Sequence, residues 1–372
     1  MCNYTKSIIL FVFVIAVILQ LNGQKNYSSQ LNPKQYDKVV FLTTHNAFNC
    51  SADAFSFPNQ DYTLAQQLTA EVRGFMLDVY DNGGELVLYH GYSILGYKPL
   101  SYELNQIKTF LDNNPNEIVS IILECYVTAN KIESALSTSG LLSYAYIKTG
   151  KTWPTLQEMI NSNKRLVVFS DKNDASVSQK WYHYIWNYAV ETSFSVTDTM
   201  QFRSDYNRGN PANDLFILNH FMVTPGLGTG SKANAMIVNS NPFLANRITR
   251  CMTKTGKIPN FLTVDFHNVG NCLEEVYRLN GITNLYQEIK IENSLKVSPN
   301  PSLGIFTVVL PAWAYPPYSY KILTLSGICV LSGSSSEIKP TISLTHKIAT
   351  GIYFLRITDV NDHYLTTKIC FK

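Results

Sequence analysis

The stretch "KVVFLTTHNAF", residues 38–48, joins a short run of β-branched and aromatic residues to a histidine and an asparagine. Val39 to Leu42 are all apolar, which is typical of a strand that is covered on both faces. The run ends on His45 and Asn46. A strand covered on both faces belongs to a parallel sheet with helices outside it, so strands and helices should alternate along the chain.

That alternation continues to about residue 270. Six further runs of this kind follow: "VRGFMLDVY", "ELVLYHG", "EIVSIILECY", "RLVVFSDK", "DLFILNHFMV" and "NFLTVDFHN". Intervening segments such as "LSYELNQIKTFLDNNPNE" place apolar residues at helical spacing. Seven or eight strands in roughly 240 residues favour a closed TIM-type (β/α) barrel over an open doubly wound sheet. No glycine-rich dinucleotide turn follows the first strand, which also disfavours the open sheet.

The first 24 residues of this 372-residue chain resemble a targeting segment rather than part of the fold. One early lysine precedes an apolar run from Ile8 to Leu19, which is short for a membrane-spanning helix. We therefore predict a signal peptide at residues 1–24, and a protein that is secreted or held at the cell surface. Without Lys6 the charge count is 29 basic minus 27 acidic residues, or +2. Such near-neutrality argues against a nucleic-acid partner.

The C-terminal part has a different pattern. After about residue 290 short alternating strands are separated by Gly and Asn turns, which predicts a small all-β sandwich at residues 293–372. The barrel would then occupy residues 25–288.

Cysteines are sparse. Six remain after Cys2, without a C-x-x-C pair or zinc-type spacing. Export would permit disulfides, and Cys251 with Cys272, or Cys329 with Cys370, are the first pairs to test, although spacing leaves the pairing open.

Polar side chains end every predicted barrel strand. In (β/α) barrels the chemistry lies at the C-terminal ends of the strands. The residues at these ends are His45, Asn46, Asp78, His90, Glu124, Asp171, Lys172, Asn219, His220, Asp265 and His267. The two histidines that follow early strands, His45 and His90, suit acid and base work, because imidazole exchanges protons near neutral pH. Cleavage of a phosphodiester by an internal hydroxyl requires one such group to take a proton and another to give one.

The charge that develops on phosphorus needs a partner. Asn46, Asp78 and Glu124 are oxygen donors on neighbouring strand ends, the type of ligand that Ca²⁺ or Mg²⁺ prefers. Asp265 is placed to orient His45, as a carboxylate often does for a catalytic base.

Successive motifs resemble the phosphatidylinositol-specific phospholipase C X-domain family, in particular its small exported branch. They are "THNAF", "NQDYTLAQQLTAEVRGFMLDVYD", "LYHGY", "NPNEIVSIILECYVT", "NKRLVVFSDK", "WNYAVE" and "LNHF", in order over roughly residues 37 to 285. The resemblance implies a distorted phosphodiesterase barrel that acts on an inositol phospholipid or glycolipid. It makes His45 the base for the inositol 2-hydroxyl and His90 the acid for the diacylglycerol leaving group. It also places Asn46, Asp78 and Glu124 where calcium-dependent members hold the ion, and Lys172 where the headgroup is contacted.

One position departs from the family pattern. Metal-dependent members read Glu-Leu-Asp on the second strand, whereas this chain reads Met76-Leu77-Asp78, so one carboxylate is missing. Fewer charged ligands imply weaker calcium binding. Metal-independent members have arginine at the position of Asp78, which this chain lacks. Arg73, just before this strand, is expected to be structural.

The tail resembles the type A C-terminal sorting domain of the type IX secretion route, through "VSPNPSLGIFTV", "YKILTLSG" and "GIYFLRI". That resemblance implies recognition by secretion machinery. The aromatic segment "QKWYHYIWNYAVE" offers Trp181, Tyr182 and Trp186 for a lipid interface, but core packing at helical spacing is the favoured interpretation of Trp186. The segment "TPGLGTGSKAN" is expected to be a flexible rim loop.

Two other functions stay open. A surface module that binds lipid or glycan without turnover is conceivable because of Met76. A glycerophosphodiester phosphodiesterase fits less well, because its Arg-Gly after the first histidine and its Glu-x-Asp on the second strand are absent.

Overall fold

The computed structural model describes residues 29–225, 229–282, 295–309, 317–325, 327–336, 341–343, 348–358 and 364–372. The chain divides into two compact units, Met1–Ile282 and Thr283–Lys372, which are described separately. The predicted signal peptide lies outside the described residues, as do residues 226–228 of the predicted rim loop.

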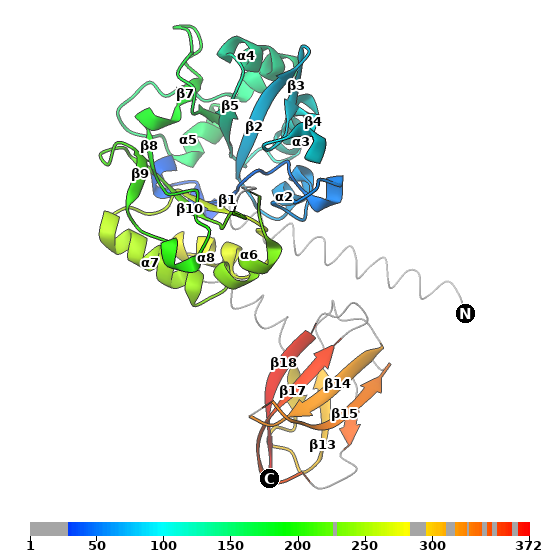
Figure 1. The fold of residues 1–372 in the computed structure, drawn as a ribbon. Coiled ribbons are helices and arrows are strands. Elements are labelled where there is room, and N and C mark those ends of the chain that lie inside the picture. Colours follow the sequence, from blue (N-terminus) through cyan, green and yellow to red (C-terminus); the bar gives the residue numbers. More distant parts are fainter. Residues whose placement is uncertain are drawn as a thin grey trace, which may run out of the picture. The chain divides into compact units, whose positions relative to one another are not determined.

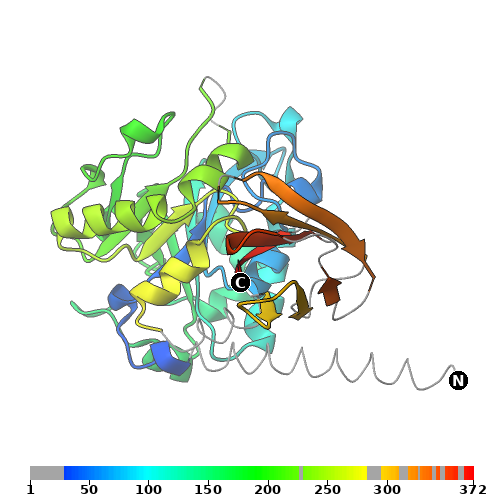
Figure 2. The same ribbon diagram turned by 90° about the horizontal axis from the view of Figure 1, so that it is seen from below.

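The first unit is a curled, mostly parallel sheet with helices around it (Figures 1 and 2). The strand order is β7-β6-β5-β2-β1-β11-β10-β8-β9, and β3 and β4 extend from β2. The strands are β1 Phe41–Thr44, β2 Gly74–Asn82, β3 Glu85–Leu88, β4 Lys98–Pro99, β5 Val119–Cys125, β6 Leu166–Ser170, β7 Tyr182–Tyr184, β8 Ala189–Thr192, β9 Tyr206–Gly209, β10 Leu215–His220 and β11 Phe261–Val264. The helices are α2 Leu64–Thr69, α3 Leu100–Asn113, α4 Ala129–Thr138, α5 Leu156–Asn161, α6 Lys232–Val238, α7 Phe243–Thr255 and α8 Cys272–Leu279. The predicted TIM-type barrel is confirmed in a distorted, half-barrel form.

Both faces of the central strands are buried, as the apolar runs predicted. Leu42 of β1 packs into the large core between the sheet and the helices. Its neighbour Phe41 points the other way and packs on Phe261, with ring centroids 6.1 Å apart. Helix α3 covers the outer face with Leu104 and Ile107, which recur at helical spacing. The loss of one such side chain to alanine typically costs about 2–5 kcal/mol.

One predicted barrel strand is not parallel. The run "ELVLYHG" forms β3, which pairs antiparallel with β2 through Val79 opposite Leu88 and Asn82 opposite Glu85. The cause is the turn at Gly83 and Gly84, whose positive φ values of 64° and 101° favour glycine. The chain therefore returns beside β2, and the residues after β3 arrive at the level of Asp78.

The aromatic segment "QKWYHYIWNYAVE" is not helical. It forms the short strands β7 and β8, joined by a single 3₁₀ turn at Ile185–Asn187. Trp181 and Tyr182 are buried, and the packing at helical spacing predicted for Trp186 does not occur, because the segment forms no α-helix. Trp186 is partly buried, and the Arg208 guanidinium lies 4.4 Å from its ring centroid.

Neither expected disulfide is present, because all six described cysteines are free thiols. Cys251 on α7 and Cys272 on α8 are buried, and their sulfurs face Ser204 Oγ at 3.2 Å and the Val269 carbonyl at 3.8 Å.

The second unit consists of two antiparallel sheets, as expected for a β-sandwich. One contains β12 Lys296–Ser298, β13 Ile305–Val309 and β16 Thr341–Ser343. The other has the order β15-β14-β17-β18, formed by Cys329–Ser335, Tyr318–Leu323, Gly351–Thr358 and Tyr364–Phe371. Cys329 and Cys370 lie on the two edge strands of this sheet, roughly 14 Å apart at normal strand spacing, which is too far for a disulfide.

Three buried histidines should make the first unit sensitive to acid. Burial lowers the pKa of His183 and of His267 to about 4, and that of His220 to about 3. The unfolded chain protonates histidine near pH 6.5 and therefore binds more protons than the folded chain between these values. Stability is then fully present above about pH 6.5 and falls as the pH drops, by about 2 kcal/mol per histidine by pH 5. Urea unfolding at pH 7, 6 and 5 measures this loss, and a constant free energy of unfolding would contradict the prediction.

Candidate active site

His45 and Asp265 meet because their strands are parallel neighbours. Thr44 of β1 pairs with Val264 of β11, so the next residue of each chain segment emerges at the same level. His45 Nδ1 lies 2.9 Å from Asp265 Oδ1. The structure thus brings together the predicted base and its predicted orienting carboxylate, and leaves Nε2 as the ring atom available to a substrate.

Three residues that the sequence did not single out hold this pair in place. Asn59 Nδ2 donates to Asp265 Oδ1 at 3.1 Å, and Gln60 Nε2 donates to the His45 carbonyl at 3.0 Å. Phe221 stacks flat on the His45 ring, with centroids 3.8 Å apart and planes 7° apart. Asn59 and Gln60 lie within a quoted motif, and Phe221 directly follows β10, but no spacing rule distinguishes them from ordinary loop and core residues.

His90 has its own carboxylate. Its Nδ1 lies 3.0 Å from Asp78 Oδ2, and the Asp78 side chain is almost entirely buried. The Asn46 amide satisfies both neighbours when its nitrogen faces Asp78 Oδ1 and its oxygen faces His90 Nδ1, each at 3.1 Å. Burial raises the pKa of the Asp78 carboxyl, as does the nearby Glu124, whereas the hydrogen bond from His90 lowers it.

The two imidazoles lie next to each other. Their ring centroids are 6.3 Å apart and their planes are inclined by 73°. Two rings at this separation can each make a hydrogen bond to a different oxygen of one phosphate group. The arrangement can therefore remove a proton on one side of a phosphate and deliver one on the other.

In this structure the predicted calcium ligands Asp78 and Glu124 both have protein partners. Asp78 is engaged by His90, and Glu124 accepts a hydrogen bond from the Tyr126 hydroxyl. Met76 lies on the same face of β2 as Asp78, so a thioether stands where a hard cation requires oxygen.

Lys172 is tied to the strand ends. Its Nζ donates to the Val127 carbonyl at 2.8 Å and lies 3.6 Å from Asp174 Oδ2. With about a third of its side chain exposed, it is placed at the rim of the mouth, near the ends of β5 and β6.

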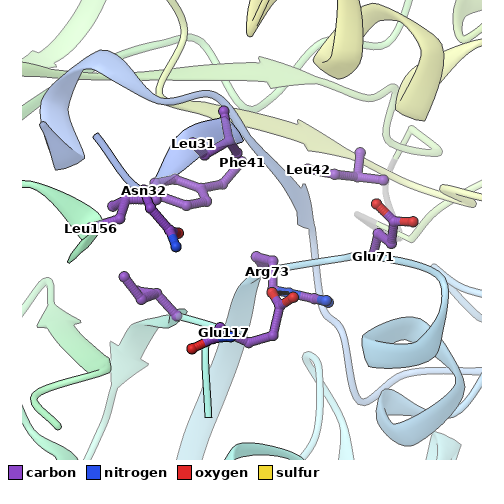
Figure 3. A pocket seen from close by; sticks show the side chains of 10 residues that line it. Leu31, Asn32, Phe41, Leu42, Glu71, Arg73, Glu117 and Leu156 are labelled. Carbon is purple, nitrogen blue, oxygen red and sulfur yellow. Dashed lines mark hydrogen bonds and ion pairs between the residues drawn. The ribbon is translucent and has the colours of Figure 1, made fainter. Parts of the chain in front are cut away.

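Arg73 is structural, as expected. Its Nε donates to Glu117 Oε2 at 2.8 Å, and its Nη1 donates to two main-chain carbonyls. Figure 3 shows this ion pair in a small pocket with Phe41, Glu71 and Leu156. Phe41, Arg73 and Glu117 lie at or just before the N-terminal ends of β1, β2 and β5, opposite the histidines.

Comparisons with known proteins identify the family of the first unit and of the C-terminal part. Residues 31–280 match the family model described as PI-PLC X 1, and residues 296–372 match the secretion system C-terminal sorting domain. The chain is 29% identical over 280 residues to a PI-PLC X domain-containing protein of Arabidopsis thaliana, over 68% of this chain and 64% of that protein. It is 28% identical over 286 residues to an uncharacterized secreted protein of Arthroderma benhamiae, over 67% of this chain and 62% of that protein. The chain thus spans less than two thirds of the length of either relative.

Among solved structures, a mutant of phosphatidylinositol-specific phospholipase C from Staphylococcus aureus superposes with a TM-score of 0.49. The sequence identity is 13%, and the alignment covers 69% of this chain and 96% of that one.

Proposed function

The chain belongs to the PI-PLC X family, and from that premise we propose that its first unit is a phosphodiesterase that cleaves phosphatidylinositol or a related glycolipid. The observation that carries the proposal is the meeting of two carboxylate-bound imidazoles, His45 with Asp265 and His90 with Asp78, with ring centroids 6.3 Å apart.

In the proposed reaction the inositol 2-hydroxyl attacks phosphorus and the bond from phosphorus to the diacylglycerol oxygen breaks. His45 Nε2 takes the hydroxyl proton, because Asp265 keeps the other proton of the ring on Nδ1. His90 Nε2 gives a proton to the departing oxygen while Asp78 holds its Nδ1. The products are diacylglycerol and a cyclic inositol phosphate.

The residues on this chain account for each proton transfer without a metal ion. The imidazolium of His90, and that of His45 after it takes a proton, are the positive charges next to the phosphate. Calcium stays a prediction from the family resemblance. Because Met76 supplies no oxygen ligand beside Asp78, we expect turnover to persist in chelator.

Export is the second part of the proposal. The match to a sorting domain at residues 296–372 and the similarity to a secreted protein support passage through a secretion machinery. Across the part of the chain that the structure describes, no helix is long and apolar enough to span a bilayer.

A substrate panel tests the proposal. The purified protein is incubated with vesicles of phosphatidylinositol, phosphatidylcholine or phosphatidylethanolamine, and with glycerophosphoinositol, each with calcium and with chelator. We expect diacylglycerol release from the inositol lipid in both conditions. Preference for glycerophosphoinositol would indicate a glycerophosphodiesterase, and vesicle binding without any product would indicate the binding module. Loss of turnover in chelator would support the predicted calcium site.

A further inference from the structure

Three tyrosines form a continuous stack that the proposed mechanism does not use. Tyr80 lies between the other two, 3.8 Å from the Tyr89 centroid and 4.2 Å from the Tyr126 centroid. The ring planes differ by only 15° and 8°. They come from β2, from the residue that follows β3, and from the residue that follows β5.

The strand register places this stack at the mouth of the barrel. Asp78 of β2 pairs with Glu124 of β5, and Tyr80 and Tyr126 follow each of them by two residues. Residues two apart on a strand point to the same side, so both tyrosines stand about 7 Å further toward the mouth. Leu77 and Val79, which alternate with these side chains, pack outward against the helices.

The stack also adjoins the proposed acid, because Tyr89 immediately precedes His90. Tyr80 also shares a face of β2 with Asp78, the carboxylate that lies 3.0 Å from His90 Nδ1. The stack is therefore close to a substrate bound at His90.

The end of the stack is open. Tyr80 covers one face of Tyr126, yet 55% of Tyr126 is exposed, so its other face is accessible. The Tyr126 hydroxyl donates to Glu124, whose side chain is itself exposed. An accessible aromatic face and a carboxylate acceptor are thus held together by one hydrogen bond.

This pairing has the chemistry that a polyol ring requires. Such a ring has a face of C–H groups that packs on an aromatic ring, and hydroxyls around its edge that donate to a carboxylate. An acyl chain has no hydroxyl that could donate a hydrogen bond to Glu124. A headgroup with additional phosphates would be repelled by Glu124 and by Asp171, a neighbouring carboxylate at the end of β6.

We propose that Tyr126, supported by Tyr80, forms with Glu124 a subsite for the ring of a neutral polyol, either the inositol of the headgroup or a sugar attached to it. The subsite deepens the proposed function and rests on it for the substrate. It gives Glu124 a role in recognition that does not involve a metal ion.

Titration of the full chain with two neutral probes, myo-inositol and methyl glucoside, tests the subsite by saturation-transfer NMR. We expect saturable binding, weakened about fivefold to tenfold by Tyr126→Ala. Tyr126→Phe keeps the ring and loses the bond to Glu124, so it should weaken binding less. Tyr102→Ala removes a comparably exposed tyrosine from helix α3 and should change nothing. Saturation by myo-inositol assigns the ring to the headgroup, and saturation by the glucoside alone assigns it to an attached sugar.

Two results would overturn the subsite: no saturation by either probe, or equal binding by Tyr126→Ala and the unmodified protein. Thermal melting by circular dichroism confirms that each variant is folded. Failure of the proposed function is a separate outcome. Polyol binding that depends on Tyr126 without lipid hydrolysis would leave the subsite and remove the reaction. Lipid hydrolysis with an unchanged KM in Tyr126→Ala would support the reaction and remove the subsite.

Discussion

Replacement of either histidine by alanine is expected to reduce turnover of the inositol lipid by about 10²–10⁴-fold, the usual contribution of general acid or base catalysis. His45→Ala removes the ring that Asp265 orients, and His90→Ala removes the ring that Asp78 orients. Initial rates of diacylglycerol release measure both effects. The double variant should be little worse than the worse single variant, because the two groups act in one step.

His183 offers a matched control. Its ring is buried among aromatic side chains, with Nδ1 3.0 Å from the Val168 carbonyl, and it takes no part in the site. His183→Phe should retain turnover if the protein folds, which thermal melting shows. Unchanged turnover in both His45→Ala and His90→Ala would end the proposed mechanism.

Asp265→Asn is expected to lower kcat on the order of 10³-fold with little change in KM. In the present structure Asp265 Oδ1 faces His45 Nδ1, and its Oδ2 is buried without a hydrogen-bond partner within the described residues. An asparagine amide can donate to Nδ1 and so move the ring proton to Nε2, the atom that must accept from the substrate. The imidazolium formed during the reaction would also lose its counter-charge.

Glu117→Gln is the control for this variant. Glu117 is also a paired carboxylate, bound to Arg73 at the opposite end of the barrel. Its loss should lower thermal stability and leave kcat unchanged. An Asp265→Asn variant with normal kcat would show that the carboxylate is structural. A rise in KM with an unchanged kcat would instead give Asp265 a role in substrate binding.

The strand ends were readable from the sequence because buried parallel strands are apolar runs that stop at polar residues. His45, Asp78 and Asp265 were placed at the same end of the barrel by that rule alone, and the structure locates them there. Which strands are neighbours in the sheet could not be predicted from the sequence. That β1 lies beside β11 depends on closure of the sheet between segments about 220 residues apart.

The sequence-based predictions of secondary structure were wrong where local turns or very short strands determine the structure. A run such as "ELVLYHG" has the composition of a barrel strand, and only the turn at Gly83 and Gly84 reverses it. Strands of three or four residues such as β7 and β8 are too short to show a period of two. The tyrosine stack depends on both the antiparallel return of β3 and the register of β2 with β5, so no pattern in the sequence reveals it.

The most direct test of the central claim compares two leaving groups. His90 is assigned to protonate the diacylglycerol oxygen as it leaves. A nitrophenyl ester of inositol phosphate releases nitrophenolate, which leaves without being protonated. We predict that His90→Ala loses most of its turnover on the lipid and little on the nitrophenyl ester, while His45→Ala loses both. Equal losses on the two substrates in His90→Ala would contradict the assignment of one imidazole as base and the other as acid.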